Sequence, residues 1–119
     1  MLVKLLKSKL HRATVTKTKV HYPGSIGIDA ELMAAAGILP YEQVLVGDLD
    51  NGNRLETYVI AAEPGSRAIE VLGAAARLIH ENDLVIIMGF GLFTPEEAKK
   101  HRPKVVVLDK NNNIIEQRP

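Results

Sequence analysis

The dipeptide Gly24-Ser25 carries the most distinctive potential chemistry in this sequence. When a fold strains a Gly-Ser bond, the serine hydroxyl can attack the glycine carbonyl carbon, and the acyl group then moves from nitrogen to oxygen. β-Elimination of the ester releases the glycine carboxylate, and hydrolysis of the remaining dehydroalanine leaves a pyruvoyl group. Glycine suits the first position because it tolerates strained dihedral angles and leaves its carbonyl open to attack. The pair therefore allows the chain to make its own electrophile, although most Gly-Ser pairs are ordinary turns.

Several other catalytic and metal-binding patterns are missing. The four histidines do not fall at metal-ligand spacings and no HExxH motif occurs, so the sequence predicts no metal site. Pro23 stands where a G-x-S-x-G nucleophile elbow needs glycine, which disfavours a hydrolase serine. The chain has no cysteine, which excludes disulfides, thiol nucleophiles and zinc-thiolate sites.

Five polar residues lie in or beside predicted strands, namely Lys9, His11, Arg54, Thr57 and Tyr58, and four of them are candidates for binding and proton transfer. Lys9 and Arg54 could hold carboxylates, because ammonium and guanidinium groups pair with acids. Thr57 could donate a hydrogen bond to a carbonyl, and Tyr58 could donate a proton. Neighbouring strand residues point to opposite faces, so a pocket shared by Thr57 and Tyr58 needs a bulge or a second subunit. The plainer alternative is that these side chains simply face water, as half of a strand often does.

The composition limits the classes of partner. Fifteen basic and fourteen acidic residues give a net charge of +1, and aromatic residues make up only 4%, so we expect no nucleic-acid partner. No apolar run approaches the ~18 residues of a membrane span, and lysines interrupt the apolar N-terminus, so we expect no membrane segment and no signal peptide. The 119 residues are consistent with one domain. We expect a soluble cytoplasmic protein, with which the absence of cysteine is compatible.

The elements that must position these residues are mostly short strands. Asn51-Gly52 predicts a hairpin with a type I′ turn, and the apolar run at 84–90 predicts a strand that is buried on both faces. Many short strands with turn signals every ~8–12 residues indicate a small β-barrel. The candidate strands are residues 1–10, 13–20, 42–48, 54–62, 67–72, 84–90 and 104–109, with a turn at 111–113 into a last short strand.

Two helices are predicted from their ends. Asp29 can cap a helix over 30–36 that ends at Gly37. Thr94-Pro95-Glu96-Glu97 combines an N-cap threonine, proline at the first helical position and glutamate at the third, which predicts a capped helix to about residue 101.

Several segments in order resemble the pyruvoyl-dependent aspartate 1-decarboxylases. The resemblance runs from residue 9 to about residue 107. It implies a mainly β fold, a small double-psi β-barrel with a few short helices. The segments that carry it are KLHRATVT (9–16), HYPGSIGID (21–29), AAGI (35–38), NGNRLETY (51–58), GSR (65–67), GAAA (73–76), VII (85–87) and the helix containing PEEA.

The resemblance also implies how the chain matures and assembles. A single domain, 1–119, would cleave itself between Gly24 and Ser25 into the fragments 1–24 and 25–119. The cofactor would be a covalent pyruvoyl group derived from Ser25. The assembly would be a homotetramer with active sites between subunits. Whether maturation uses a helper protein stays open at this point.

The implied reaction is the decarboxylation of L-aspartate to β-alanine and CO2 through a Schiff base with the pyruvoyl group. β-Alanine would feed pantothenate and so coenzyme A biosynthesis. Thr57 would polarise the Gly24 carbonyl during cleavage, Tyr58 would return a proton to the substrate, and Arg54 would bind a carboxylate. The other residues implied at the site are Lys9, Gly73, Ala74 and Ala75 for substrate binding, and His11, Tyr22 and Ile86 as pocket support.

One residue departs from the pattern. Members of this family usually carry an asparagine before the GAAA turn, where this chain has Leu72. A side-chain amide there could form a hydrogen bond within the site, and leucine cannot. The alternative function is therefore an uncleaved barrel that binds a small acid or a protein partner without catalysis. A pyruvoyl decarboxylase acting on another amino acid is a further alternative.

Overall fold

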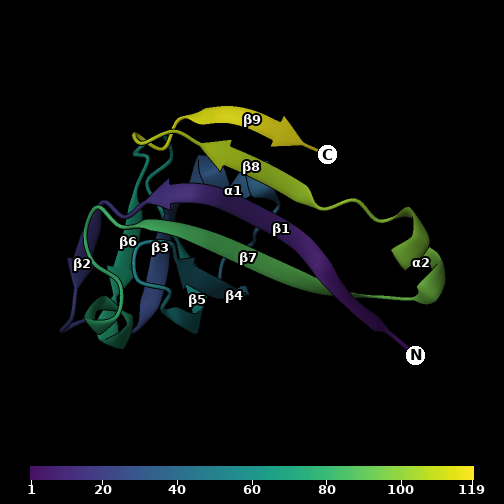
Figure 1. Cartoon of the computed structure of the whole chain (residues 1–119), viewed down its shortest axis with the longest axis horizontal. Helices are drawn as coiled ribbons and strands as arrows, with labels where there is room; N and C mark the ends of the chain where they lie inside the picture. Colours follow the sequence, from purple (N-terminus) through teal and green to yellow (C-terminus); the bar gives the residue numbers. More distant parts are fainter.

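The computed structural model describes residues 1–119 as nine strands in one sheet, with two short α-helices and one 3-10 helix (Figure 1). The mainly β class with few helices is therefore confirmed, and no helix has the length and apolar character needed to cross a membrane. The strands are β1 Val3–Thr14, β2 Lys17–Lys19, β3 Ser25–Asp29, β4 Gln43–Asp48, β5 Arg54–Ala62, β6 Ile69–Leu72, β7 Leu84–Phe93, β8 Lys104–Leu108 and β9 Ile114–Arg118; the helices are α1 Ala30–Ala36, η1 Gly73–Arg77 and α2 Pro95–Lys100.

The sheet joins strands that are distant in the sequence. Its order is β2-β6-β3-β5-β4-β7-β1-β8-β9, so most neighbours are not consecutive along the chain. Three pairs are parallel, namely β1 with β8, β2 with β6 and β3 with β5. Parallel neighbours need crossover connections, which a simple up-and-down meander lacks. This mixed topology is in keeping with the double-psi barrel that the resemblance implies.

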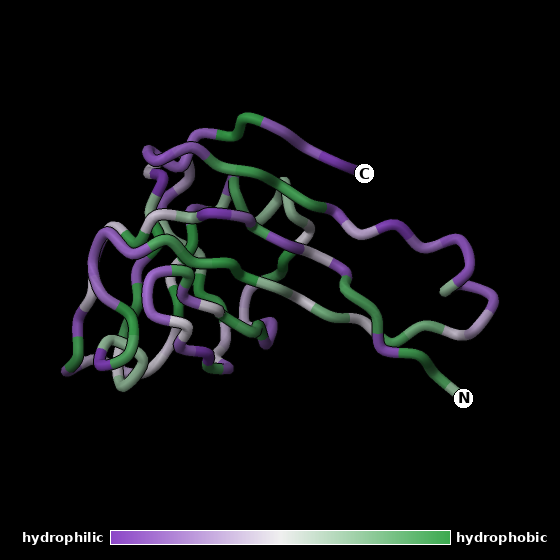
Figure 2. The backbone as a smooth tube through the Cα atoms, viewed as in Figure 1, coloured by the Kyte–Doolittle hydropathy of each residue, from purple (hydrophilic) through white to green (hydrophobic).

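The core lies between the strands and α1. Twenty buried apolar residues form one cluster, to which α1 contributes Leu32, Met33 and Ala36. Figure 2 shows apolar residues along the middle of β7 and β8, whereas the C-terminal end of the chain is hydrophilic. The strand β9 accordingly covers the edge of the sheet with mostly exposed side chains.

The expectation that the apolar strand at 84–90 is buried on both faces is wrong. Along β7, Val85 and Ile87 are fully buried, whereas Ile86 and Met88 are only partly buried. The reason is that β7 lies between the antiparallel neighbours β1 and β4, and only one face of this part of the sheet covers the core.

Local signals at the helix ends are confirmed. The Asp29 carboxylate accepts a hydrogen bond from the backbone N–H of Glu31 at 2.8 Å, and Gly37 ends α1 in the left-handed conformation. Thr94 and Glu97 form the reciprocal capping box at the start of α2.

The hairpin at Asn51-Gly52 is confirmed, but its turn type is not. The strands β4 and β5 pair antiparallel up to Gly47 opposite Arg54. A type I′ turn needs positive φ at both central residues, and only Gly52 has it, at 78°. The connection is a longer turn in which the Asp48 carboxylate accepts hydrogen bonds from the backbone of Asp50 and Asn51.

Candidate active site

The Gly24-Ser25 bond lies at the surface end of β3. Gly24 is exposed, whereas Ser25 is only 2% exposed and pairs with Leu72 of β6. In the neighbouring parallel strand β5, Val59 lies opposite Ile26 of β3. The register therefore brings the residues just before Ile26 beside the part of β5 that precedes Val59, which contains Thr57 and Tyr58.

A pocket of about 410 Å³ opens at this position. It combines the cleavage-site glycine with strand residues from β5 and small residues from η1, so it has room for a small ligand beside Gly24. Its lining consists of Gly24, Leu55, Glu56, Thr57, Tyr58, Leu72, Ala74, Ala75 and Leu78.

Gly73 sets the conformation of the cleavage segment. It has φ of 81°, which side-chain-bearing residues rarely adopt, and it packs directly on the segment that precedes Ser25. A Cβ atom at Gly73 would lie 2.6 Å from the Gly24 Cα and 2.9 Å from the Tyr22 carbonyl oxygen. Only glycine leaves the backbone of residues 22–24 where it is.

Thr57 and Tyr58 both line the pocket without a bulge between them. Thr57 lies opposite Val44 and Tyr58 opposite Gln43, in unbroken register. Their side chains therefore alternate between the two faces of the strand. Thr57 is half-buried, whereas Tyr58 is 41% exposed and stands at the rim of the pocket.

Besides Ser25 and Gly73, which are next to lining residues in the chain, five expected site residues do not line this pocket. Lys9 and His11 lie on β1, and Ile86 lies on β7. In the sheet order, β5, β4 and β7 separate β1 from β3, where Ser25 lies. Arg54 is exposed at the first position of β5, two residues before the pocket-lining Glu56, and the exposed Tyr22 precedes Gly24.

The surroundings of His11 are electropositive. Burial lowers the pKa of His11 below its usual value, and the charges of Lys9, Arg12 and Arg118 lower it further. The imidazole is therefore neutral at pH 7, and its Nδ1 is buried without a hydrogen-bond partner. A group of cations around a neutral ring is a suitable environment for a carboxylate ligand.

Three lining residues were not anticipated from the sequence. Leu55 and Glu56 precede Thr57 on β5, and Leu78 follows η1. Alternation along residues 54–58 could have suggested the first two. Nothing in the local sequence indicates Leu78, because its position depends on how η1 packs against β2 and β6.

The chain is similar to a known protein family, to individual enzymes and to a solved structure. The family model described as aspartate decarboxylase matches residues 1–115. An aspartate 1-decarboxylase of Caldicellulosiruptor saccharolyticus is 56% identical over 97% of this chain and 90% of its own length. The enzymes of that name from Acetivibrio thermocellus and Clostridium kluyveri are 56% and 54% identical, over 97% and 98% of this chain and 91% of their own lengths. Among solved structures, the computationally designed protein msDPBB_sym2 aligns with a TM-score of 0.46 and 20% identity, over 73% of this chain and 99% of the designed chain.

Proposed function

The chain belongs to the aspartate decarboxylase family, and we propose that it converts L-aspartate to β-alanine and CO2 with a pyruvoyl group that it makes from Ser25. One observation carries the proposal most directly. The buried Ser25 follows Gly24 at a pocket that Thr57 and Tyr58 also line. A Gly-Ser bond, a threonine hydroxyl and a tyrosine phenol at one pocket are the groups that self-cleavage and decarboxylation need.

We propose that maturation proceeds at the Gly24-Ser25 bond. Ser25 Oγ bonds to the Gly24 carbonyl carbon while the peptide C–N bond breaks, which leaves an ester and a free amine. The Thr57 hydroxyl donates to the Gly24 oxygen and stabilises the charge that develops there. Elimination then releases Gly24 as a carboxylate, and water converts the dehydroalanine at residue 25 to pyruvoyl with loss of ammonia.

The residues present fit such a group. Gly73 has no Cβ, so the backbone at residues 22–24 lies against it, and the small Ala74 and Ala75 leave the pocket open. A pyruvoyl group supplies a ketone that reacts with an amine and an electron sink for the electron pair left when CO2 departs. It requires neither a metal nor a thiol, in agreement with the residues that line the pocket.

The chain's own side chains orient the acid and supply the proton. Aspartate has two carboxylates, and Arg54 and Lys9 provide two cations to hold them. The half-exposed Tyr58 donates its phenolic proton to the substrate carbon after CO2 leaves. His11 and Ile86 support the Lys9 side of the site. The product, β-alanine, would be available for pantothenate synthesis.

The separation of Lys9 from the Gly24 pocket supports an assembly with shared sites. Lys9 lies on β1 and Gly24 precedes β3, and three strands lie between β1 and β3 in the sheet order. We propose a homotetramer in which β1 and β7 of one subunit meet the Gly24 pocket of its neighbour. A cytoplasmic location, which the absence of cysteine allows, is part of the same proposal.

Intact-mass spectrometry of the purified protein tests maturation directly. We expect two fragments, 1–24 and 25–119, with the larger one lacking a free amine and reacting with borohydride or hydroxylamine. The matched control is Ser25→Ala, which removes only the nucleophilic oxygen and must remain intact. An intact wild-type chain after prolonged warming would instead favour the barrel that binds a small acid or a partner without catalysis.

A direct assay tests the substrate. Release of labelled CO2 from L-aspartate, with glutamate tested in parallel, distinguishes an aspartate enzyme from a pyruvoyl decarboxylase for another amino acid. A protein that is cleaved but inactive on aspartate would retain the cofactor proposal and reject the substrate.

Mixed oligomers test the shared site. Ser25→Ala and Lys9→Ala subunits should each be inactive alone. Co-expressed, they should regain part of the activity, because some sites combine an intact Ser25 with an intact Lys9 from a neighbour. If mixed oligomers form but remain inactive, both residues must come from the same chain.

A further inference from the structure

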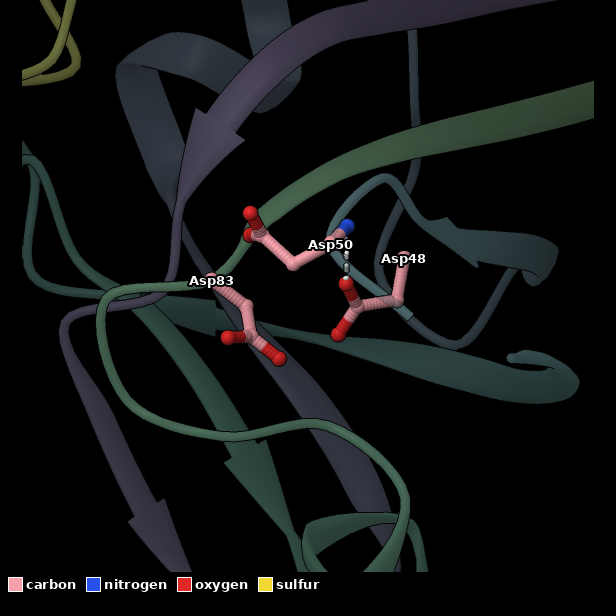
Figure 3. A group of neighbouring side chains, drawn as sticks. All are labelled: Asp48, Asp50 and Asp83. Atoms are coloured by element: carbon pink, nitrogen blue, oxygen red, sulfur yellow. Dashed lines mark hydrogen bonds between the residues drawn. The ribbon is translucent and has the colours of Figure 1, made fainter. Parts of the chain in front are cut away.

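The carboxylates of three aspartates lie close together outside the proposed active site. Asp48 and Asp50 lie in the turn between β4 and β5, and Asp83 lies immediately before β7. One carboxylate oxygen from each lies within 4.8 Å of the others (Figure 3). The sequence did not predict this group, because Asp83 is far from the other two along the chain.

Backbone N–H groups fix all three carboxylates. Asp48 accepts from the N–H of Asp50 at 2.8 Å and of Asn51 at 3.3 Å through its Oδ1. Asp50 Oδ2 accepts from Leu84 N at 2.8 Å, and Asp83 Oδ2 accepts from His80 N at 3.0 Å. Each carboxylate is thus held through one oxygen, which leaves the second oxygen for another ligand.

The second oxygen of Asp48 is the observation that points to a ligand. Asp48 is 3% exposed, and its Oδ2 is buried with no hydrogen-bond partner. Figure 3 shows this oxygen directed toward the carboxylate of Asp83. Burying a carboxylate oxygen beside another carboxylate costs free energy unless a positive charge or a proton lies between them.

We propose that Asp48, Asp50 and Asp83 bind one hard divalent cation, with water completing its coordination. Three convergent carboxylate oxygens are the donors that Ca²⁺ and Mg²⁺ prefer, and oxygens less than 4.8 Å apart can share an ion at 2.3–2.6 Å, the range for Ca²⁺. Burial of Asp48 beside Asp83 concentrates negative charge, which is unfavourable without a counter-ion. A cation would neutralise it.

The position of the site gives the cation a structural role. The turn 48–53 is already joined to the loop before β7, because the side-chain amides of Asn51 and Asn53 donate to the Leu78 carbonyl at 3.0 and 2.8 Å. Leu78 lines the Gly24 pocket, and Arg54 follows Asn53 directly. A bound cation would therefore hold together the two segments that flank the pocket.

Calorimetric titration of the metal-free wild-type protein with CaCl2 at pH 8, repeated with MgCl2, tests the site. At this pH Asp48 is ionised, so proton competition is small. We expect one Ca²⁺ per chain with a dissociation constant of about 10⁻⁴ to 10⁻³ M. At ten times that concentration, the melting temperature should rise by about 5 °C.

Asp50→Asn is the main variant, because Asp50 is exposed and its replacement should not prevent folding. It should weaken Ca²⁺ binding at least about tenfold, since affinity follows the number of charged ligands. Asp48→Asn should do the same if it folds. The control is Asp109→Asn, which removes one charge from a similar turn, where Asp109 accepts from the backbone of Asn111 and Asn113.

The outcomes are distinct. Weakened binding in Asp50→Asn with unchanged binding in Asp109→Asn supports the site. Absence of saturable binding up to about 10 mM for either ion, or equal binding in Asp50→Asn and the wild type, overturns it. In that event the buried Asp48 oxygen is accounted for by a proton shared with Asp83.

Discussion

Replacing Gly73 by alanine should slow maturation strongly while leaving the chain folded. The new Cβ would lie 2.6 Å from Gly24 Cα, 2.9 Å from the Tyr22 carbonyl oxygen and 3.0 Å from Gly24 N. All three neighbours are backbone atoms, so they cannot move aside as the end of a flexible side chain can. Ordinary contact begins near 3.4 Å, so Gly24 must move by about 0.8 Å.

That displacement falls on the residue whose carbonyl Ser25 must attack. A misplacement of about 1 Å between reacting groups can cost about 10²-fold in rate, so we expect self-cleavage to slow by about 10²-fold. The left-handed φ of 81° adds strain of about 1–3 kcal/mol for alanine. The assay is the fraction of intact chain over time by mass spectrometry, with urea unfolding measured on the same samples.

Gly52 provides a control that separates the effect of backbone strain from the effect of the contact with Gly24. Gly52 has a similar φ of 78°, but a Cβ there meets nothing within 4 Å. Gly52→Ala should therefore lose comparable stability and still cleave at the wild-type rate. If Gly73→Ala cleaves as fast as Gly52→Ala, the contact with Gly24 does not control the geometry of the cleavage site and the reasoning is refuted.

Four further predictions concern single side chains. Thr57→Val should slow cleavage at least tenfold with an unchanged melting temperature, because only the hydroxyl is lost. Tyr58→Phe should cleave normally but lose about 10²–10⁴ in decarboxylation rate, measured as CO2 release. Leu72→Asn should speed cleavage, since its amide would add a donor at the pocket wall; a slower or equal rate by mass spectrometry would contradict this. Burial alone would raise the pKa of Asp29, but hydrogen bonds from the backbone of Arg67, Glu31 and Gly65 and from the Arg67 side chain lower it overall. The stabilisation that Asp29 contributes is therefore present above the unfolded pKa of about 3.9 and is lost as pH falls through the lower folded pKa. Urea unfolding between pH 5 and pH 2 should show this loss in the wild type and not in Asp29→Asn.

Features determined by neighbouring residues could be predicted from the sequence. The caps of α1 and α2 depend on Asp29, Gly37 and Thr94, which act within one or two turns of their own helix. Most strands were found for the same reason, since alternation and turn residues are local signals. The self-cleavage reaction at Gly24-Ser25 could also be predicted, because the reacting atoms are adjacent in the chain.

Features that depend on strand pairing could not be predicted. The contact between Gly73 and Gly24 exists because β6 pairs with β3, which places Leu72 opposite Ser25. The aspartate group exists because β4 pairs with β7, with Asp48 opposite Val85 and so close to Asp83. No local pattern fixes these registers. The sequence likewise does not show which strands lie beside β7, so it does not predict that one face of β7 is only partly buried.

Cleavage after Gly24 would remove the only covalent link between the fragment 1–24 and the rest of the chain, yet the fold provides a way to keep the fragment bound. That fragment contains β1, which pairs along its length with β7 and in parallel with β8. It also carries β2, which pairs with β6. The fully buried Leu10 and Ala13 anchor β1 in the core. Retention matters for the proposed activity, because Lys9 and His11 lie on the same strand. The geometry thus allows the peptide bond to break at an exposed glycine while the cations needed for the substrate stay in place.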